Sequence, residues 1–209
     1  MAPSEDRELW EARYGAARSV WGWAPNRFVA EVLGPLSPGR ALDLACGEGR
    51  NALWLADLGW RATAVDFSEN ALTRGRAQAA EHGLDVEWVA ADVLEYRPEP
   101  AAYDAVVIAY LHLGPDKLGT VLRHAEAALA PGGTLVVVGH DVTNIADGVG
   151  GPQDPAILLT PELVTERLSG LRVTRAERVH RQTDLAAQPA IDTLVVAQAA
   201  GSAVSASDR

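Results

Sequence analysis

Short apolar runs alternate with helix-like segments through the middle of the chain, between Arg40 and Gly139. Continuous apolar runs of this kind are typical of strands that are buried on both faces of a sheet. Strands that are joined through helices pair in parallel, because a crossover is needed to bring the chain back to the same edge. The pattern therefore predicts an α/β fold: a Rossmann-like, doubly wound, mostly parallel sheet with helices on both faces.

Turn residues and helix caps divide the chain into its expected elements. Strands are expected at residues 40–45, 60–65, 85–90, 103–109 and 134–139. Helices are expected at residues 4–17, 26–33, 51–58, 68–81, 115–129 and 160–168. Two more strand-like runs, 171–179 and 191–197, follow one another without a helix between them. They predict an antiparallel hairpin at the edge, which makes a sheet of seven strands.

Length and composition indicate one globular domain. The chain has 209 residues, of which 48% are hydrophobic, and no internal repeat or long linker divides it. We expect a single domain over residues 1–199, in which residues 1–35 form a helical cap over the active site. The small polar residues 200–209 are expected to be a disordered tail.

Several kinds of site and partner are disfavoured. Cys46 is the only cysteine, so neither an internal disulfide nor a cysteine-based zinc site is expected, and we predict no metal. No apolar run approaches the ~20 residues of a membrane span, and the charged N-terminus does not look like a secretory signal. The net charge of −10 would repel nucleic acid. A cytoplasmic protein with a small-molecule substrate, monomeric or homodimeric, is the simplest interpretation.

The segment from Ala41 to Asn51 joins a strand to a helix through a glycine-rich turn. Gly47 and Gly49 allow backbone to approach a ligand closely, and the following helix presents unpaired N–H groups. Ligands of open α/β sheets bind outside the carboxyl ends of the strands. The turn therefore predicts a site for a nucleoside-bearing cofactor.

Acidic side chains follow three of the expected strands. Asp43 lies near the end of the first, Asp66 closes the second and Asp92 closes the third. A carboxylate at the second position can accept two hydrogen bonds from a ribose diol, and one at the third can accept from the amine of adenine. The spacing Gly47-x-Gly49-x-x-Ala52 also matches the loose dinucleotide fingerprint, which leaves an NAD-linked oxidoreductase as an alternative. A regulatory module that binds the cofactor without turnover is the other.

Four segments together resemble class I S-adenosylmethionine-dependent methyltransferases: DLACGEGR, TAVDFSENAL, ADVLEY and LAPGGTLVVVG, within residues 41–139. The resemblance implies a seven-stranded sheet that ends in an antiparallel hairpin, with S-adenosyl-L-methionine as cofactor. Ala45 departs from the motif, where the family has its first glycine. The segments LWEARY, WGWAPN and GRNALWLA further resemble thiopurine and tellurite-resistance methyltransferases, which act on thiols or chalcogen oxyanions.

By this resemblance, the cofactor-binding residues include the glycine turn, the strand ends and part of the N-terminal segment. They are Asp43, Ala45, Cys46, Gly47, Gly49, Arg50, Asn51, Asp66, Phe67, Asp92, Val93, Tyr110, Arg13 and Trp21. Methyl transfer depends mainly on alignment and exclusion of water, so no fixed set of catalytic side chains is expected.

The acceptor is expected beyond the fourth and fifth strands. His112, His140 and Asp141 are the candidate catalytic residues, since a histidine there can take or orient a proton near neutral pH. Trp23, His112 and Asn144 are the candidate substrate-binding residues, and the glycine- and proline-rich stretch after His140 is a candidate lid. A thiol acceptor is preferred, followed by a tellurite-like oxyanion, halide, hydroxyl and amine.

Overall fold

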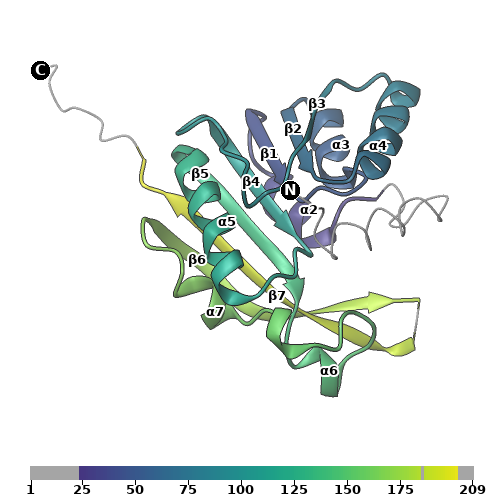
Figure 1. Ribbon diagram of the computed structural model, residues 1–209, viewed down its shortest axis with the longest axis vertical. Helices are drawn as coiled ribbons and strands as arrows, with labels where there is room; N and C mark the ends of the chain where they lie inside the picture. Colours follow the sequence, from purple (N-terminus) through teal and green to yellow (C-terminus); the bar gives the residue numbers. More distant parts are fainter. Residues whose placement is uncertain (1–23, 185, 202–209) are drawn as a thin grey trace, which may run out of the picture.

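The computed structural model describes residues 24–184 and 186–201 and is built on one seven-stranded sheet (Figure 1). The strands are β1 (Arg40–Leu44), β2 (Arg61–Asp66), β3 (Val86–Ala90), β4 (Tyr103–Ala109), β5 (Leu129–His140), β6 (Leu171–Thr183) and β7 (Ala186–Ala199). The helices are α2 (Arg27–Leu33), α3 (Arg50–Asp57), α4 (Glu69–His82), α5 (Pro115–Ala128), α6 (Asn144–Asp147), η1 (Pro155–Ile157) and α7 (Pro161–Thr165).

The strands lie in the order β3-β2-β1-β4-β5-β7-β6. Strands β1 to β5 pair in parallel, whereas β7 is antiparallel to both of its neighbours. This confirms the predicted mostly parallel sheet with a C-terminal antiparallel hairpin. Because β1 lies between β2 and β4, the chain changes direction across the sheet at the end of β1, where α/β sheets bind ligands.

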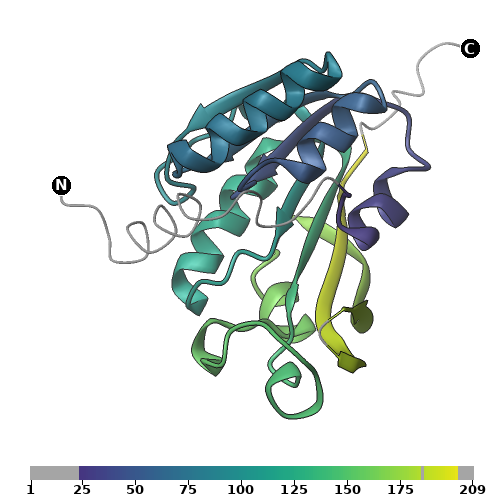
Figure 2. The same ribbon diagram turned by 90° about the vertical axis from the view of Figure 1, so that its right-hand side faces the viewer.

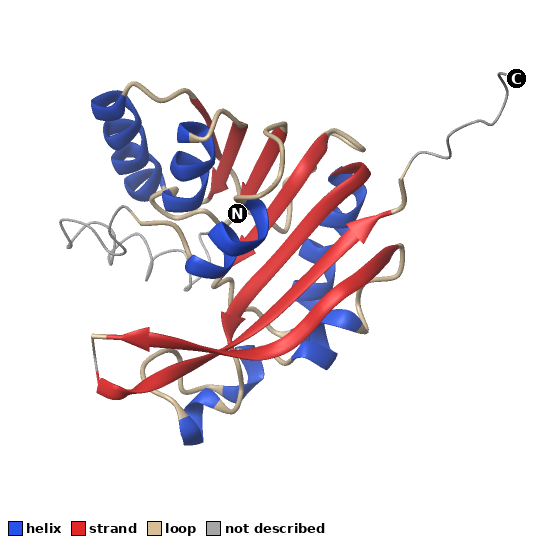
Figure 3. Cartoon of the chain, turned by 180° about the vertical axis from the view of Figure 1, so that it is seen from behind, coloured by secondary structure: helices blue, strands red, loops and turns tan. Residues whose placement is uncertain are grey.

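Helices cover both faces of the sheet, as predicted. Side chains of β4 alternate, so Val106 and Ile108 face α5 and α7, whereas Ala105 and Val107 face α2 and α3. Helix α5 lies in front of the sheet in Figure 1 and α2 in front of it in Figure 3. A third apolar cluster packs α3 and α4 against β2 and β3.

Local signals explain where the helices begin and end. The side-chain oxygen of Asn26 accepts hydrogen bonds from the N–H groups of Phe28 and Val29 at 2.9 and 3.2 Å, which starts α2. Ser68 likewise starts α4, and Gly83 ends it in a left-handed conformation with φ of 65°. These starts and the stop agree with the sequence prediction.

The terminal hairpin is longer than predicted. Strands β6 and β7 pair from Leu171 with Ala199 as far as Thr183 with Ala186, so the hairpin projects beyond the other strands (Figure 3). The outer part of β6 is polar and that of β7 is rich in alanine, so backbone pairing rather than a strongly apolar run continues the strands there. Strand β5 also starts earlier, because Leu129 pairs with Tyr103 before the turn at residues 131–133.

The loop after β5 carries α6 and η1 and lies at the bottom of Figure 2. The predicted helix over residues 4–17 lies outside the described residues, as do Arg13, Trp21 and Trp23. Helix α2, within the predicted cap, packs Phe28, Val29 and Leu33 into the core. In the described part of the chain, no helix is long and apolar enough to cross a membrane.

Ala45 has a φ of 58°, in the left-handed region that favours glycine. A Cβ atom in this conformation costs about 1 kcal/mol or more. The variant Ala45→Gly should therefore stabilise the protein by about 1 kcal/mol, which raises the melting temperature by roughly 2–4 °C. Ala77→Gly, at an exposed position inside α4, is the control and should destabilise by about 1 kcal/mol. A melting temperature that falls in both variants would contradict the strain at Ala45.

Candidate cofactor and acceptor site

Three left-handed residues shape the turn between β1 and α3. Ala45, Gly47 and Gly49 have φ values of 58°, 58° and 78°. A Cβ atom at Gly49 would lie 2.5 Å from the ring of Trp88, which packs beneath the turn. The turn is thus held close to its support, with the N-terminus of α3 directed at the crevice.

The carboxylate of Asp66 connects this turn to the start of α4. One oxygen accepts the N–H of Gly47 at 2.8 Å, and the other accepts the N–H of Ser68 at 2.9 Å. The side chain is nearly buried, with 7% of the residue exposed. A carboxylate has about four acceptor positions and is a suitable acceptor for the hydroxyls of a ribose diol.

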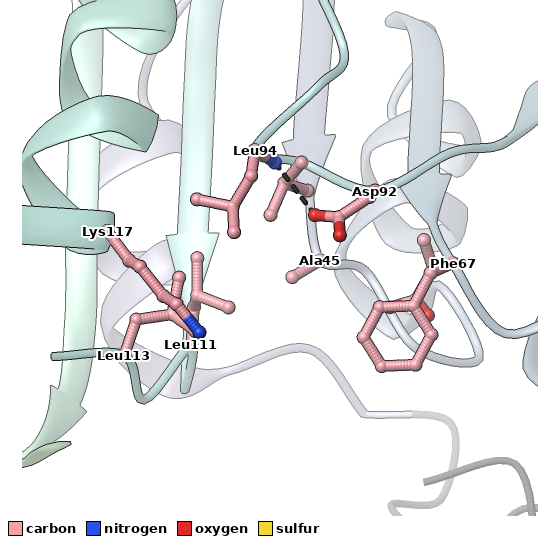
Figure 4. A pocket seen from close by; sticks show the side chains of 9 residues that line it. Ala45, Phe67, Asp92, Leu94, Leu111, Leu113 and Lys117 are labelled. Carbon is pink, nitrogen blue, oxygen red and sulfur yellow. Dashed lines mark hydrogen bonds between the residues drawn. The ribbon is translucent and has the colours of Figure 1, made fainter. Parts of the chain in front are cut away.

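A pocket opens beside these strand ends (Figure 4) and encloses about 450 Å³, part of it open to solvent. It is lined by Ala45, Asp66, Phe67, Asp92, Val93, Leu94, Leu111, Leu113 and Lys117. One oxygen of Asp92 accepts the N–H of Leu94 at 2.9 Å. Its second oxygen and the apolar walls fit a flat base that carries an amine. We call this the nucleoside pocket.

Lys117, Leu111 and Leu113 were not predicted from the sequence. Leu111 and Leu113 follow β4, and Lys117 lies in the first turn of α5, where it points toward the two leucines (Figure 4). Lys117 is the only lysine in the chain. Lys117 follows the carboxyl end of β4 closely in the sequence, and this position could have indicated that it lines the pocket.

Asp43 is buried without a hydrogen-bond partner among the described residues. Its side chain is 1% exposed, and neither oxygen is paired there. Burial is the main cause that raises its pKa to about 7; the nearby backbone N–H of Ala52 and the charge of Arg50 oppose this rise, and Asp66 adds to it. An unpaired buried acid beside the glycine turn fits the cationic end of S-adenosylmethionine.

A second pocket lies past the ends of β4 and β5 and encloses about 650 Å³, also partly open. Its lining residues are Pro25, Asn26, Arg27, Arg50, Tyr110, His140, Arg181 and Gln182. We call it the arginine pocket. Tyr110 has a φ of 58°, an unusual conformation that directs the chain away from β4.

Asp192 on β7 lies behind the arginine pocket and connects three of its side chains. It accepts hydrogen bonds from Tyr110 Oη and Arg181 Nε, both at 2.7 Å. His140 Nδ1 lies 3.3 Å from its other oxygen. Burial raises the pKa of Asp192, but His140, Arg181 and Tyr110 outweigh it and lower the pKa to about 2. Burial and the neighbouring Asp192 raise the pKa of Tyr110.

His112 and His140 stack, with ring centres 5.3 Å apart and planes at 17°. Nε2 of His112 lies 3.2 Å from the backbone nitrogen of His140 and accepts its N–H. Burial, followed by repulsion from His140, lowers the pKa of His112 to about 4. His112 is therefore neutral near pH 7, with one nitrogen already used. Of the two histidines, only His140 lines the arginine pocket.

Asp141 and Asn144 fasten the loop after β5 to the sheet. Asp141 accepts hydrogen bonds from Thr143, Arg178 and Thr193. These bonds outweigh burial and lower its pKa. Asn144 accepts the N–H of Ile191 at 2.7 Å and donates to the carbonyl of Gly150 at 2.8 Å. Such contacts favour positioning roles for Asp141 and Asn144 over the contact with substrate that the sequence suggested.

The same loop covers His140. A Cβ atom at Gly151 would lie 2.8 Å from three atoms of the His140 ring. Gly151 itself has a φ of 76°. The loop is thus packed over one wall of the arginine pocket, where the sequence predicted a lid.

The other predicted cofactor residues surround the glycine turn. The side-chain oxygen of Asn51 accepts the N–H of Asn26 at 2.9 Å, which connects α3 to α2. Arg50 lies 5.8 Å from the ring of Tyr110. Cys46 is half-buried, and burial raises the pKa of its thiol. No group of residues suited to a metal ion occurs in the part of the chain that the structure describes.

Fold and site together define an α/β protein whose crevice, at the carboxyl ends of β1 to β4, suits a nucleoside-bearing cofactor. Residues 41–133 match a family described as "Methyltransferase domain". Residues 41–133 are thus similar to a methyltransferase domain.

Relatives with a sequence match cover part of the chain. A demethylmenaquinone methyltransferase of Thermus thermophilus is 36% identical over 104 residues, 49% of this chain and 47% of its own. A ubiquinone biosynthesis O-methyltransferase of Bordetella pertussis is 34% identical over 114 residues, 54% and 45% of the two chains. TehB of Haemophilus influenzae, a probable S-adenosyl-L-methionine-dependent methyltransferase, is 26% identical over 112 residues, 53% and 39%. The chain thus spans about half the length of the first two.

Solved structures show the same fold over nearly the whole chain. One, described as "Conversion of a Disulfide Bond into a Thioacetal Group during Echinomycin Biosynthesis", has a TM-score of 0.73 at 21% identity and covers 96% of this chain and 95% of its own. TehB from Haemophilus influenzae has a TM-score of 0.67 at 17% identity, with 92% and 66% covered.

The buried carboxyl of Asp43 gives a pH-dependent prediction. Its pKa rises from the ordinary value of 3.8 to about 7 in the folded protein, so the native state binds the extra proton and stability falls as pH rises through this window. Asp43→Asn removes that ionisation. The variant should gain stability over the natural protein at pH 8, on the order of a few kcal/mol, and clearly less at pH 5, where only part of the window between the two pKa values has been passed.

Thermal unfolding of both proteins at the two pH values measures this difference. Asp57→Asn, at an exposed position at the end of α3, is the matched control. Its difference in stability from the natural protein should be the same at pH 5 and at pH 8. A gain for Asp43→Asn that is equal at pH 5 and pH 8 would show that burial does not penalise its charge.

Proposed function

We propose that this protein is an S-adenosylmethionine-dependent methyltransferase that acts on a small molecule, with sulfur or another chalcogen as the acceptor atom. The observation that carries the proposal is the row of carboxylates around the glycine turn. Asp43, Asp66 and Asp92 lie near the ends of three neighbouring strands; Asp66 and Asp92 line the nucleoside pocket, and Asp43 is buried beside the glycine turn. Each offers an acceptor of the type that its part of the cofactor requires.

Each of these residues would bind a different part of the cofactor. Asp66 would hold the ribose diol, and Asp92 the adenine amine, with Phe67 and Val93 against the base. Asp43 would face the cationic methionine end. When bound, the cofactor supplies a methyl group activated by a sulfonium, so the protein needs chiefly to align the acceptor and exclude water.

The acceptor would enter through the arginine pocket, beside Tyr110 and His140. Asp192 lies next to Nδ1 of His140 and favours the tautomer that keeps the proton there, which leaves Nε2 to accept a proton. In the proposed reaction, a thiol gives its proton to Nε2 of His140. The thiolate formed in this way would be the nucleophile for the methyl group that the bound cofactor would supply. The products are a thioether and S-adenosylhomocysteine.

The preference for sulfur has three supports. The N-terminal segments and GRNALWLA resemble the thiopurine and tellurite-resistance group. TehB matches in sequence and in fold, and the solved structure with a TM-score of 0.73 is described by chemistry at sulfur. A thiolate also needs little beyond deprotonation, for which one histidine suffices.

A hydroxyl acceptor is the second candidate. The relatives with the higher sequence identity are named for menaquinone and ubiquinone methylation, and one is named as an O-methyltransferase. A phenolic hydroxyl has a pKa near 10, so it would depend on His140 more strongly than a thiol does.

The remaining expectations stand as proposals. They are a single domain over residues 1–199, with residues 1–35 closing the active site, and a monomer or homodimer in the cytoplasm. A regulatory module without turnover would consume the cofactor slowly with every acceptor. An NAD-linked oxidoreductase would bind nicotinamide instead.

Cofactor binding is tested by calorimetric titration with S-adenosylhomocysteine. The natural protein should bind it, and Asp66→Asn should bind at least about tenfold more weakly, because a charged acceptor is lost. Asp57→Asn is the control and should bind normally. If the natural protein binds NAD but not S-adenosylhomocysteine, the proposed function fails.

The role of His140 is tested with two thiols that differ in acidity. His140→Gln should lower kcat/KM about a hundredfold for an alkyl thiol at pH 7. The loss should be much smaller for 4-nitrothiophenol, which is already ionised. The control is His180→Gln, an exposed residue on β6. An equal loss for both thiols would show that His140 does not take the proton.

A further inference from the structure

The arginine pocket is strongly cationic in a chain whose net charge is −10. Arg27, Arg50 and Arg181 line it, together with His140, and no aspartate or glutamate occurs among its lining residues. Asp192 lies behind the wall with no exposed side-chain area, and its single charge is paired with Arg181. The lining therefore carries an excess of positive charge.

Arg181 is held in a fixed orientation. Its Nε donates to Asp192 at 2.7 Å, and Nη2 lies 3.5 Å from the other carboxylate oxygen. Its guanidinium also lies 5.4 Å from the ring centre of Tyr110. These contacts use one side of the planar group and leave Nη1 for a ligand. An arginine fixed in this way loses little entropy when it binds an anion.

Arg27 faces the same pocket from α2. It is exposed, lies 4.8 Å from the ring of Phe28 and forms no ion pair with a described residue. The amide of Gln182 adds a further donor beside Arg181. Two guanidinium groups from distant segments and an amide in the same lining match the chemistry of a carboxylate.

The arginines of this pocket, which lies next to the expected methionine end of the cofactor, differ in their position relative to the glycine turn. The nucleoside pocket lies at the ends of β1 to β4, and Arg50 directly follows the glycine turn. Arg181 comes from β6, at the far edge of the sheet. Arg50 is thus the arginine placed for the cofactor, and Arg27 and Arg181 lie on the acceptor side.

We propose that Arg27 and Arg181 form a subsite for an anionic group on the methyl acceptor, so that the acceptor is a small organic acid such as a thiol that carries a carboxylate. This inference rests on the proposed function and narrows its substrate class. The anionic group would sit against the guanidinium groups and place the acceptor atom beside His140 and Tyr110.

The test compares acids with their neutral amides. The pairs are 3-mercaptopropionate with 3-mercaptopropionamide, and 2-mercaptobenzoate with 2-mercaptobenzamide. The natural protein should methylate each acid with a kcat/KM at least about tenfold above that of its amide. The preference should reside mainly in KM and weaken in about 0.5 M salt, which screens charges more strongly.

Two variants test whether the preference for acids depends on the arginine pocket. Arg27→Gln should lower the acid preference severalfold. Arg181→Lys keeps a charge beside the buried Asp192, so folding is preserved, but it loses the fork of donors and should also lower the preference. Arg172→Gln, an exposed arginine on the same strand, is the control and should change nothing.

Calorimetry with S-adenosylhomocysteine separates the possible outcomes. Unchanged cofactor affinity in Arg27→Gln, with loss of the acid preference, supports the inference. If the amides react as well as the acids, or if no acid reacts although the cofactor binds, the inference is wrong and the cofactor site stands. If Arg27→Gln weakens cofactor binding as much as it weakens turnover, the pocket holds the cofactor's carboxylate instead. Absence of cofactor binding in the natural protein would defeat the proposed function itself.

Discussion

The carboxylate of Asp66 connects the two turns on which the cofactor site depends. Its oxygens accept the N–H groups of Gly47 and Ser68, and so join the glycine turn to the start of α4. Hydrogen bonds to an ionised acceptor are about twice as strong as neutral ones. The same carboxylate faces the nucleoside pocket. A contact that fixes the backbone thereby also places the group that we propose for ribose recognition.

A second buried carboxylate organises the acceptor side. Asp192 connects Tyr110, His140 and Arg181, which come from the ends of β4 and β5 and from β6. The long hairpin is what brings Arg181 to this place, since the shorter strands that the apolar pattern predicts would end before it. The site therefore has a nucleoside half around Asp66 and a cationic half around Asp192, with Tyr110 and its left-handed backbone between them.

Much of this could be predicted from the sequence. Buried parallel strands are continuous apolar runs, so the sheet and the placement of Asp66 and Asp92 followed directly. The caps at Asn26 and Ser68 were equally clear. The arginine pocket was not, because Arg27, Arg181 and Asp192 are brought together only by tertiary packing. Asp141 and Asn144 were predicted to act on substrate, yet their hydrogen bonds to the loop and β7 could not be inferred from their type or position in the sequence.

We propose that Asp43, Asp66 and Asp92 together hold S-adenosylmethionine at the ends of β1 to β4. A crystal structure of the complex with S-adenosylhomocysteine tests it most directly. The account predicts the ribose at Asp66, adenine against Phe67 and Val93 beside Asp92, and the methionine end between Asp43 and Tyr110. A cofactor whose nucleoside lies in the arginine pocket, or whose ribose does not contact Asp66, would contradict it.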